Sequence, residues 1–78
     1  MEDQQILARR LVKDLDAAEE QILRFVVRGL SDRQIAAATS SDWENVRRFR
    51  ASLMMKLNAR TAADAVRIGL YAEVDPPD

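Results

Sequence analysis

Residues 29–57 read GLSDRQIAAATSSDWENVRRFRASLMMKL, and this stretch contains two helix-start signals in close succession. Ser31 stands three residues before Gln34, which is the spacing of a capping box, and Asp42 is a suitable N-cap for a second helix. The polar run 39–41 separates the two signals. The pattern predicts a short helix, a tight turn and a longer helix, which is the arrangement of a helix-turn-helix.

The longer of these two helices is predicted to be amphipathic. Its apolar side chains recur at steps of three and four residues, and they are Val46, Phe49, Leu53 and Leu57. At about 100° per residue, the opposite face carries a second set of side chains, with Arg47 and Ser52 at its edges. This set comprises Glu44, Arg48, Ala51 and Met55. The opposite face is therefore the candidate surface for binding a ligand.

Two more capping boxes flank this stretch. On the N-terminal side, Asp16 and Glu19 form one, and Gly29 supplies a left-handed helix end, so a helix is expected between them. Its inward side chains are expected to be Ile22, Phe25 and Val26. On the C-terminal side, Thr61 and Asp64 begin a last helix. The inner stripe of that helix is expected to be Ala62, Ala65, Val66, Gly69 and Leu70.

The composition describes one small helical domain. The chain has 78 residues, of which 47% are hydrophobic and 32% charged, and this length supports a single core. It has no cysteine and no histidine, which excludes a disulfide framework, a zinc finger and nucleophiles that depend on these residues. We therefore expect neither an enzyme nor a cofactor. No window reaches the roughly 18 apolar residues of a membrane span, so a cytoplasmic protein is expected.

The charges are segregated along the chain although the net charge is only -1. Residues 1–23 carry a net charge of -3, residues 24–60 a net of +5, and residues 61–78 a net of -3. A basic middle between acidic ends is typical of a local anion-binding face, because attraction depends on the patch more than on the total. The alternative is a chance clustering of solvated charges.

Four blocks of residues at fixed spacing carry a family resemblance. They are Gly29, Leu30 and Ser31 with Gln34, Ile35 and Ala36; Val46 with Arg47; Lys56 with Leu57; and Arg60, Thr61, Asp64, Ala65 and Val66. These blocks match the motifs GLSxxEIA, TVK, KL and KSRxEAV of the LuxR-type DNA-binding domain. Residues 15–70 resemble that domain without a gap, over about three quarters of the chain. The resemblance implies a helix-turn-helix that binds DNA.

The chain departs from the family pattern at the turn. Thr39 and Ser41 stand where the family has apolar residues, Asp42 replaces the usual capping Ser, and Glu44 adds a second acidic side chain. Trp43 is expected to brace this corner. The departures favour one alternative, a LuxR-like protein-interaction module that binds another transcription regulator or RNA polymerase, with weak or no DNA binding.

The resemblance and the helical periodicity together predict a DNA interface. Base edges would be contacted by Arg47, Arg48 and Ala51, since Arg binds guanine in a bidentate manner and Ala contacts the thymine methyl. The predicted phosphate contacts are Ser31, Arg33, Asn45, Arg50 and Lys56. The alternatives are that the arginines form an ordinary solvated face and that Ser31 is only an N-cap.

The last helix is predicted to carry a dimer interface. Exposed apolar residues at helical spacing usually indicate a partner, and LuxR-type domains pair through this helix. The interface of a weak homodimer would therefore include Arg67, Ile68 and Tyr71. The alternative is that Ile68 and Tyr71 pack within the chain against the N-terminal segment that contains Leu7 and Leu11.

We therefore expect an all-α protein with three parts. Residues 1–14 form a short N-terminal helical extension, residues 15–72 a four-helix LuxR-type helix-turn-helix domain, and residues 73–78 a flexible acidic tail. The expected function is transcriptional regulation in the bacterial nucleoid, by a dimer that inserts the helix from Trp43 to Leu57 into the major groove of double-stranded DNA. A sigma-factor promoter-reading region is a further alternative, which the Lys56 and Asp64 blocks oppose.

Overall fold

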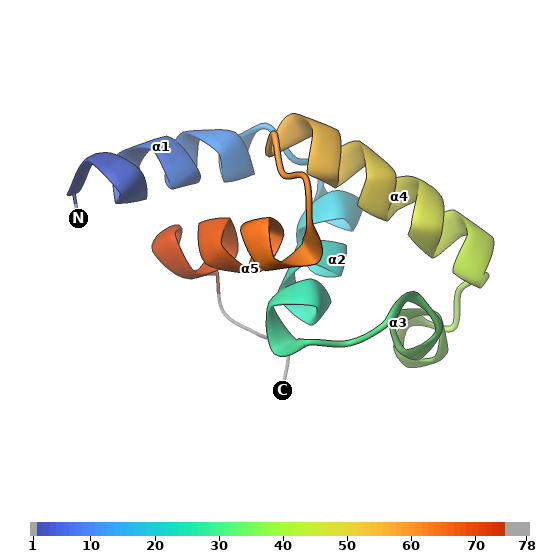
Figure 1. Ribbon diagram of the computed structural model, residues 1–78. Helices are drawn as coiled ribbons and strands as arrows, with labels where there is room; N and C mark the ends of the chain where they lie inside the picture. Colours follow the sequence, from blue (N-terminus) through green and yellow to red (C-terminus); the bar gives the residue numbers. More distant parts are fainter. Residues whose placement is uncertain (1, 75–78) are drawn as a thin grey trace.

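The computed structural model describes residues 2–74, and every regular element in this range is an α-helix (Figure 1). In chain order the helices are α1 (Glu2–Lys13), α2 (Ala17–Arg28), α3 (Asp32–Thr39), α4 (Trp43–Lys56) and α5 (Ala62–Tyr71). The predicted all-α class is confirmed. The predicted N-terminal turn is a helix of 12 residues. Residues 75–78 of the predicted tail lie outside the described range.

Local hydrogen bonds fix three of the helix starts. The side chains of Asp16, Ser31 and Thr61 each accept a hydrogen bond from the backbone N–H three residues later, and the side chain at that later position accepts one in return. Gly29 ends α2 in the left-handed conformation, with φ of 93°. These three capping boxes and this helix end are confirmed as predicted.

The start of α4 is different. The N–H of Val46 donates to the carbonyl of Asp42 at 3.1 Å, so the helix begins where expected. Asp42 occupies the N-cap position as predicted, but its side chain makes no capping hydrogen bond, so that part of the prediction is wrong. The turn before it uses Ser40 in a left-handed conformation, with φ of 53°. The hydroxyl of Thr39 donates to the Ile35 carbonyl at 2.8 Å, which satisfies a polar group at the corner.

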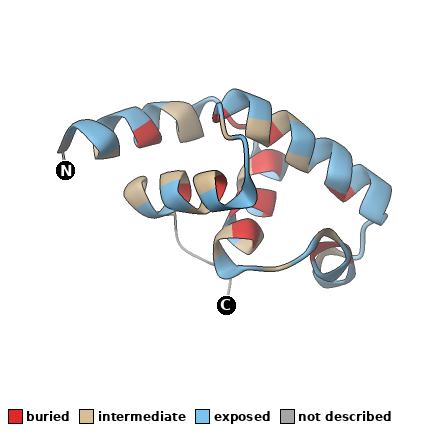
Figure 2. Ribbon diagram, in the orientation of Figure 1, coloured by how far each residue is buried: buried red, intermediate tan, exposed pale blue. Residues whose placement is uncertain are grey.

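The core lies where α2 meets both α4 and α5, with α3 packed against α4 (Figure 2). Its most deeply buried apolar side chains are Leu23, Val26, Ile35, Val46, Leu53, Leu57 and Ala65. Gly69 allows α5 to approach α2 closely, because a Cβ at this position would lie 2.5 Å from a methyl carbon of Val27. Among the described residues, no helix has the length and apolar character needed to cross a bilayer.

Three predicted inward side chains are exposed in the structure. Phe49 is 39% exposed because it lies about 60° from Val46 around α4, on the flank beside the start of α2. Leu70 is 62% exposed because the contact of α5 with α2 is centred on Ala65 and Gly69. Ala62 is exposed as well. The predictions for these three residues are corrected accordingly.

The N-terminal helix packs against the last one. Ala8 of α1 is buried, and Leu11 and Val12 are half-buried against the core. An ion pair between Arg9 and Glu73, at 3.2 Å, joins the same two regions on the surface. Helix α1 therefore covers part of α5 (Figure 1).

Candidate nucleic-acid interface

The outward face of α4 gathers the side chains that periodicity places there. Glu44, Arg47, Arg48 and Ala51 are all exposed and line one shallow hollow. Met55, further along this face, is 83% exposed. The structure therefore brings together the three residues predicted to contact bases, and it places an acidic side chain among them.

Trp43 stands at the start of this face. Its indole is 37% exposed and lines a hollow with Ala36 and Ser41, next to the turn it was predicted to brace. The guanidinium carbon of Arg33, from α3, lies 5.3 Å from the ring centroid, and that of Arg47 lies 5.1 Å from it. Both distances are in the range of cation–π contacts. A predicted phosphate contact and a predicted base contact therefore share one aromatic ring.

The C-terminal half of α4 is anchored to α2 by a buried carboxylate. Glu19 is 1% exposed, and one of its oxygens accepts hydrogen bonds from the backbone N–H of Asp16 at 2.9 Å and from the ammonium of Lys56 at 2.6 Å. Its other oxygen accepts a hydrogen bond from the hydroxyl of Ser52. Ser52, expected at the edge of the outward face, is therefore turned toward the protein. We refer to Glu19, Ser52 and Lys56 as the anchor.

The anchor is charged at neutral pH. Burial acts to raise the pKa of Glu19, but hydrogen bonds from Lys56, Ser52 and Asp16 outweigh it and lower that pKa to about 2. The hydrogen bond between Lys56 and Glu19 also raises the pKa of Lys56 above its ordinary value. Lys56, predicted as a phosphate contact, thus already holds a carboxylate.

The other predicted phosphate contacts fall into two groups. Arg50 faces the protein, where its guanidinium donates to the carboxylate of Asp32 at 2.9 Å, and about a quarter of its side chain is exposed. Arg33, Asn45 and Ser31 are exposed. The hydroxyl of Ser31 accepts the capping hydrogen bond described above, so it has a structural role whether or not it meets a phosphate.

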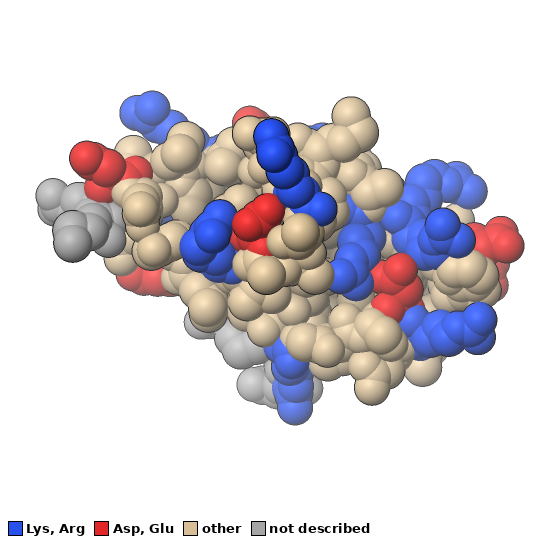
Figure 3. Space-filling model, in the orientation of Figure 1, with Lys and Arg blue, Asp and Glu red and all other residues tan. Residues whose placement is uncertain are grey.

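The molecular surface shows where the basic side chains lie relative to the acidic ones. Basic side chains gather at the end of the molecule formed by α3 and the start of α4, with acidic side chains among them (Figure 3). In a comparison with known protein families, residues 14–68 match the family described as "Bacterial regulatory proteins, luxR family". This chain belongs to the LuxR family. The family is a DNA-binding, transcription-regulating class of helix-turn-helix domain, and the match extends from before α2 into α5.

The chain is also similar in sequence to a known regulatory protein of this kind. It is 31% identical over 77 residues to the "Transcriptional regulatory protein FixJ" of Azorhizobium caulinodans. The alignment covers 99% of this chain and 36% of that protein, so the chain spans about a third of the length of its relative.

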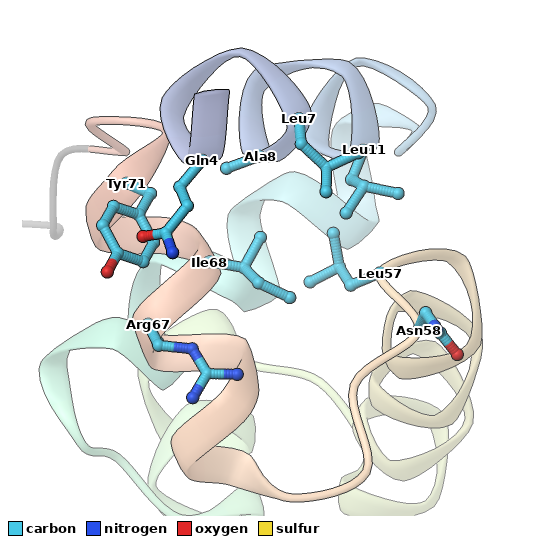
Figure 4. A pocket seen from close by; sticks show the side chains of 9 residues that line it. All are labelled: Gln4, Leu7, Ala8, Leu11, Leu57, Asn58, Arg67, Ile68 and Tyr71. Carbon is cyan, nitrogen blue, oxygen red and sulfur yellow. The ribbon is translucent and has the colours of Figure 1, made fainter. Parts of the chain in front are cut away.

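The predicted dimer residues of the LuxR-family chain lie on α5. Ile68 and Tyr71 are half-buried and line a groove with Leu7 and Leu11 of α1 (Figure 4). This is the alternative packing considered from the sequence, within a single chain. Arg67 is exposed, and its guanidinium donates to Asp64 at 3.1 Å.

The sequence does not indicate that Glu19 and Ser52 hold the C-terminal half of α4 in place. It predicts Glu19 only as half of a capping box and Ser52 only as an edge residue of the outward face. A signal for Glu19 was present, because it precedes Ile22, Leu23 and Val26 by three, four and seven residues and so lies on the inward face of α2. The partner of Ser52 is 33 residues away in the chain, and no local pattern indicates it.

Proposed function

We propose that this chain regulates transcription by binding double-stranded DNA, with the outward face of α4 in the major groove. One observation carries the proposal: Arg47, Arg48 and Ala51 line a single exposed hollow on a helix whose other face is packed against α2 and α3. A major groove is about 12 Å wide and admits one α-helix. A helix packed on one side and basic on the other suits that groove.

The chemistry of the outward face supports direct recognition of bases. A guanidinium group can donate two hydrogen bonds to guanine O6 and N7, and the methyl group of Ala51 fits against a thymine methyl. Among the described side chains, none of the ion pairs involves Arg47 or Arg48. Arg33, Asn45 and Ser31 would then contact phosphates and fix the orientation of the helix. Arg50 and Lys56 contribute positive charge while keeping their carboxylate partners.

The proposal includes a weak homodimer. One recognition helix contacts only a few base pairs, and two copies placed one helical turn apart supply a longer site. The α5 surface around Arg67, Ile68 and Tyr71 is the proposed seam, reached at the edge that α1 leaves uncovered. The apolar surface there is small, so pairing is expected mainly on DNA.

A second candidate function is supported by the same face. Glu44 lies in the hollow with the arginines, Met55 is 83% exposed on the same face, and Phe49 is 39% exposed on the adjoining flank of α4. Acidic and apolar groups of this kind suit the surface of a protein partner, such as another regulator or RNA polymerase, better than a phosphate backbone.

A titration of the full chain against a mixed-sequence duplex separates the two candidates. Counterion release predicts that affinity falls by about one decade or more between ~50 and ~200 mM salt, measured by fluorescence anisotropy. A second titration, at stoichiometric concentrations against a selected paired site, is expected to give two chains per duplex. Absence of binding at low salt, across a genomic fragment library, would contradict DNA binding and favour the protein-interaction module.

A further inference from the structure

Trp43 is the first residue of α4 and the only tryptophan in the chain. The two guanidinium groups over its ring come from different helices, Arg33 from α3 and Arg47 from α4. The indole therefore links the two helices of the helix-turn-helix at the end where basic side chains gather (Figure 3). We refer to Arg33, Trp43 and Arg47 as the stack.

The two arginines of the stack contact an aromatic ring and not a carboxylate. Among the described side chains, no carboxylate lies within ion-pair distance of Arg33 or Arg47. A cation–π contact is made by the positive charge of the guanidinium and does not pair its five N–H donors with a carboxylate. Arg33 and Arg47 are therefore restrained by the ring and keep N–H donors for a phosphate or a base.

We propose that Trp43 is a positioning residue for DNA binding, which holds Arg33 and Arg47 as one preformed pair of cations spanning α3 and α4. The inference rests on the proposed function. In this arrangement Arg33 meets the DNA backbone and Arg47 meets a base edge of the adjacent major groove. Trp43 itself acts through the two arginines.

The expected size of the effect follows from side-chain ordering. Free arginines lose conformational freedom when they bind DNA, whereas stacked ones have already lost much of it. Loss of the stack should therefore weaken DNA binding by roughly threefold to thirtyfold for the two side chains together. The loss should appear in affinity for both specific and mixed-sequence duplexes, because one of the two arginines contacts phosphate.

Two matched substitutions separate the aromatic face from simple packing. Trp43→Leu keeps an apolar side chain against Ala36 but removes the ring, whereas Trp43→Phe keeps a ring of smaller area. With circular dichroism confirming a folded chain in each case, Trp43→Leu should weaken binding by the full factor. Trp43→Phe should recover most of the affinity. Equal affinities for the two variants would overturn the proposal.

A third comparison tests whether the indole itself touches DNA. In an Arg33→Ala, Arg47→Ala background, Trp43→Leu should change the DNA affinity by less than about twofold, because the groups it positions are absent. The same fold loss in that background as in the wild-type chain would show that Trp43 contacts DNA directly, and would overturn the positioning role.

The stack can also be observed without DNA. Because the chain has one tryptophan, its emission and its quenching by acrylamide report on this ring alone. Arg33→Ala and Arg47→Ala should each increase the quenching, whereas Arg48→Ala should not, since Arg48 is not stacked on the ring. Unchanged quenching in the first two variants would overturn the stack itself. If both variants show the expected increase in quenching but the wild-type chain binds no DNA, the proposed function is refuted, and the positioning role with it.

Discussion

The two ends of α4 both carry cations and use them differently. At the N-terminal end, Arg47 and Arg48 are exposed and lie in one hollow. At the C-terminal end, Lys56 is bound at 2.6 Å to a carboxylate that is 1% exposed. A cation on α4 is exposed or bound to a carboxylate according to its surroundings. The decisive factor is whether α2 or α3 places an acidic side chain on that side of the helix.

Arg50 shows that exposed cations and carboxylate-bound cations are separated around the circumference of α4 as well as along its length. It is only two residues from Arg48, but it faces Asp32 of α3, and the pair is about three quarters buried. About 160° of helical rotation separates the two arginines. The comparison therefore predicts that substitutions on the inward side change stability and that those on the outward side change DNA binding.

The largest expected effect comes from removing the carboxylate of the anchor. Glu19→Ala deletes the acceptor of three hydrogen bonds and leaves Lys56 without its partner, so the free energy of unfolding should fall by about 2 to 4 kcal/mol. Denaturant unfolding followed by circular dichroism measures this loss. The matched control is Glu20→Ala, in the same turn, where only an exposed pair with Arg24 at 3.6 Å is lost. That control should change stability by less than about 1 kcal/mol, and equal losses in both variants would refute the anchor.

The next effect is a loss of stability in acid. The pKa of Glu19 in the folded chain, about 2, lies below its ordinary value of 4.5. Ionised Glu19 therefore stabilises the fold at pH values above about 4.5, and this contribution is lost as the pH falls from there toward 2. The loss should be smaller than in Glu19→Ala, because a protonated carboxyl keeps its volume.

Glu19→Gln is the test of that acid dependence. The amide does not titrate, so the variant should show a flatter decline of unfolding free energy between pH 4.5 and pH 2 than the wild-type chain. Identical slopes for the two chains would mean that other carboxylates control acid unfolding.

The smallest expected effect on stability is at the outward face. Arg48→Ala should leave the free energy of unfolding within about 0.5 kcal/mol of the wild type, because the side chain is exposed and takes part in no ion pair among the described residues. The same variant should lose about 1 to 3 kcal/mol of discrimination between a selected site and mixed-sequence DNA, measured by competition. A large stability loss, or unchanged discrimination, would contradict the division of α4 into two faces.

Local signals made most of the fold predictable. The capping boxes at Asp16, Ser31 and Thr61 each involve side chains three residues apart, so their geometry is contained in the sequence itself. The exposed face of α4 was predictable for the same reason, since periodicity alone separates it from the buried face. Asp42 has the right residue type and stands at the N-cap position of α4, but its side chain makes no capping hydrogen bond.

Tertiary pairing limited the prediction of the site. The hydrogen bond of Lys56 crosses 37 residues of chain, and that of Arg50 crosses 18, so neither partner can be inferred from spacing. Periodicity also predicts only which direction a helix face points. It does not predict how much of that face the neighbouring helices cover. Phe49 and Leu70 lie near the edges of their inward faces, and both are exposed.

The glycine of α5 limits how this domain can be improved by mutation. Alanine is normally the better helix residue by about 1 kcal/mol, so a glycine inside a helix is an obvious target for stabilisation. At Gly69 the new methyl group would meet a carbon of Val27 at 2.5 Å, and Val27 is a short, branched side chain with little room to rotate. Directed evolution for thermal resistance should therefore accept changes at the exposed residues of α5 and keep rejecting every one at this position.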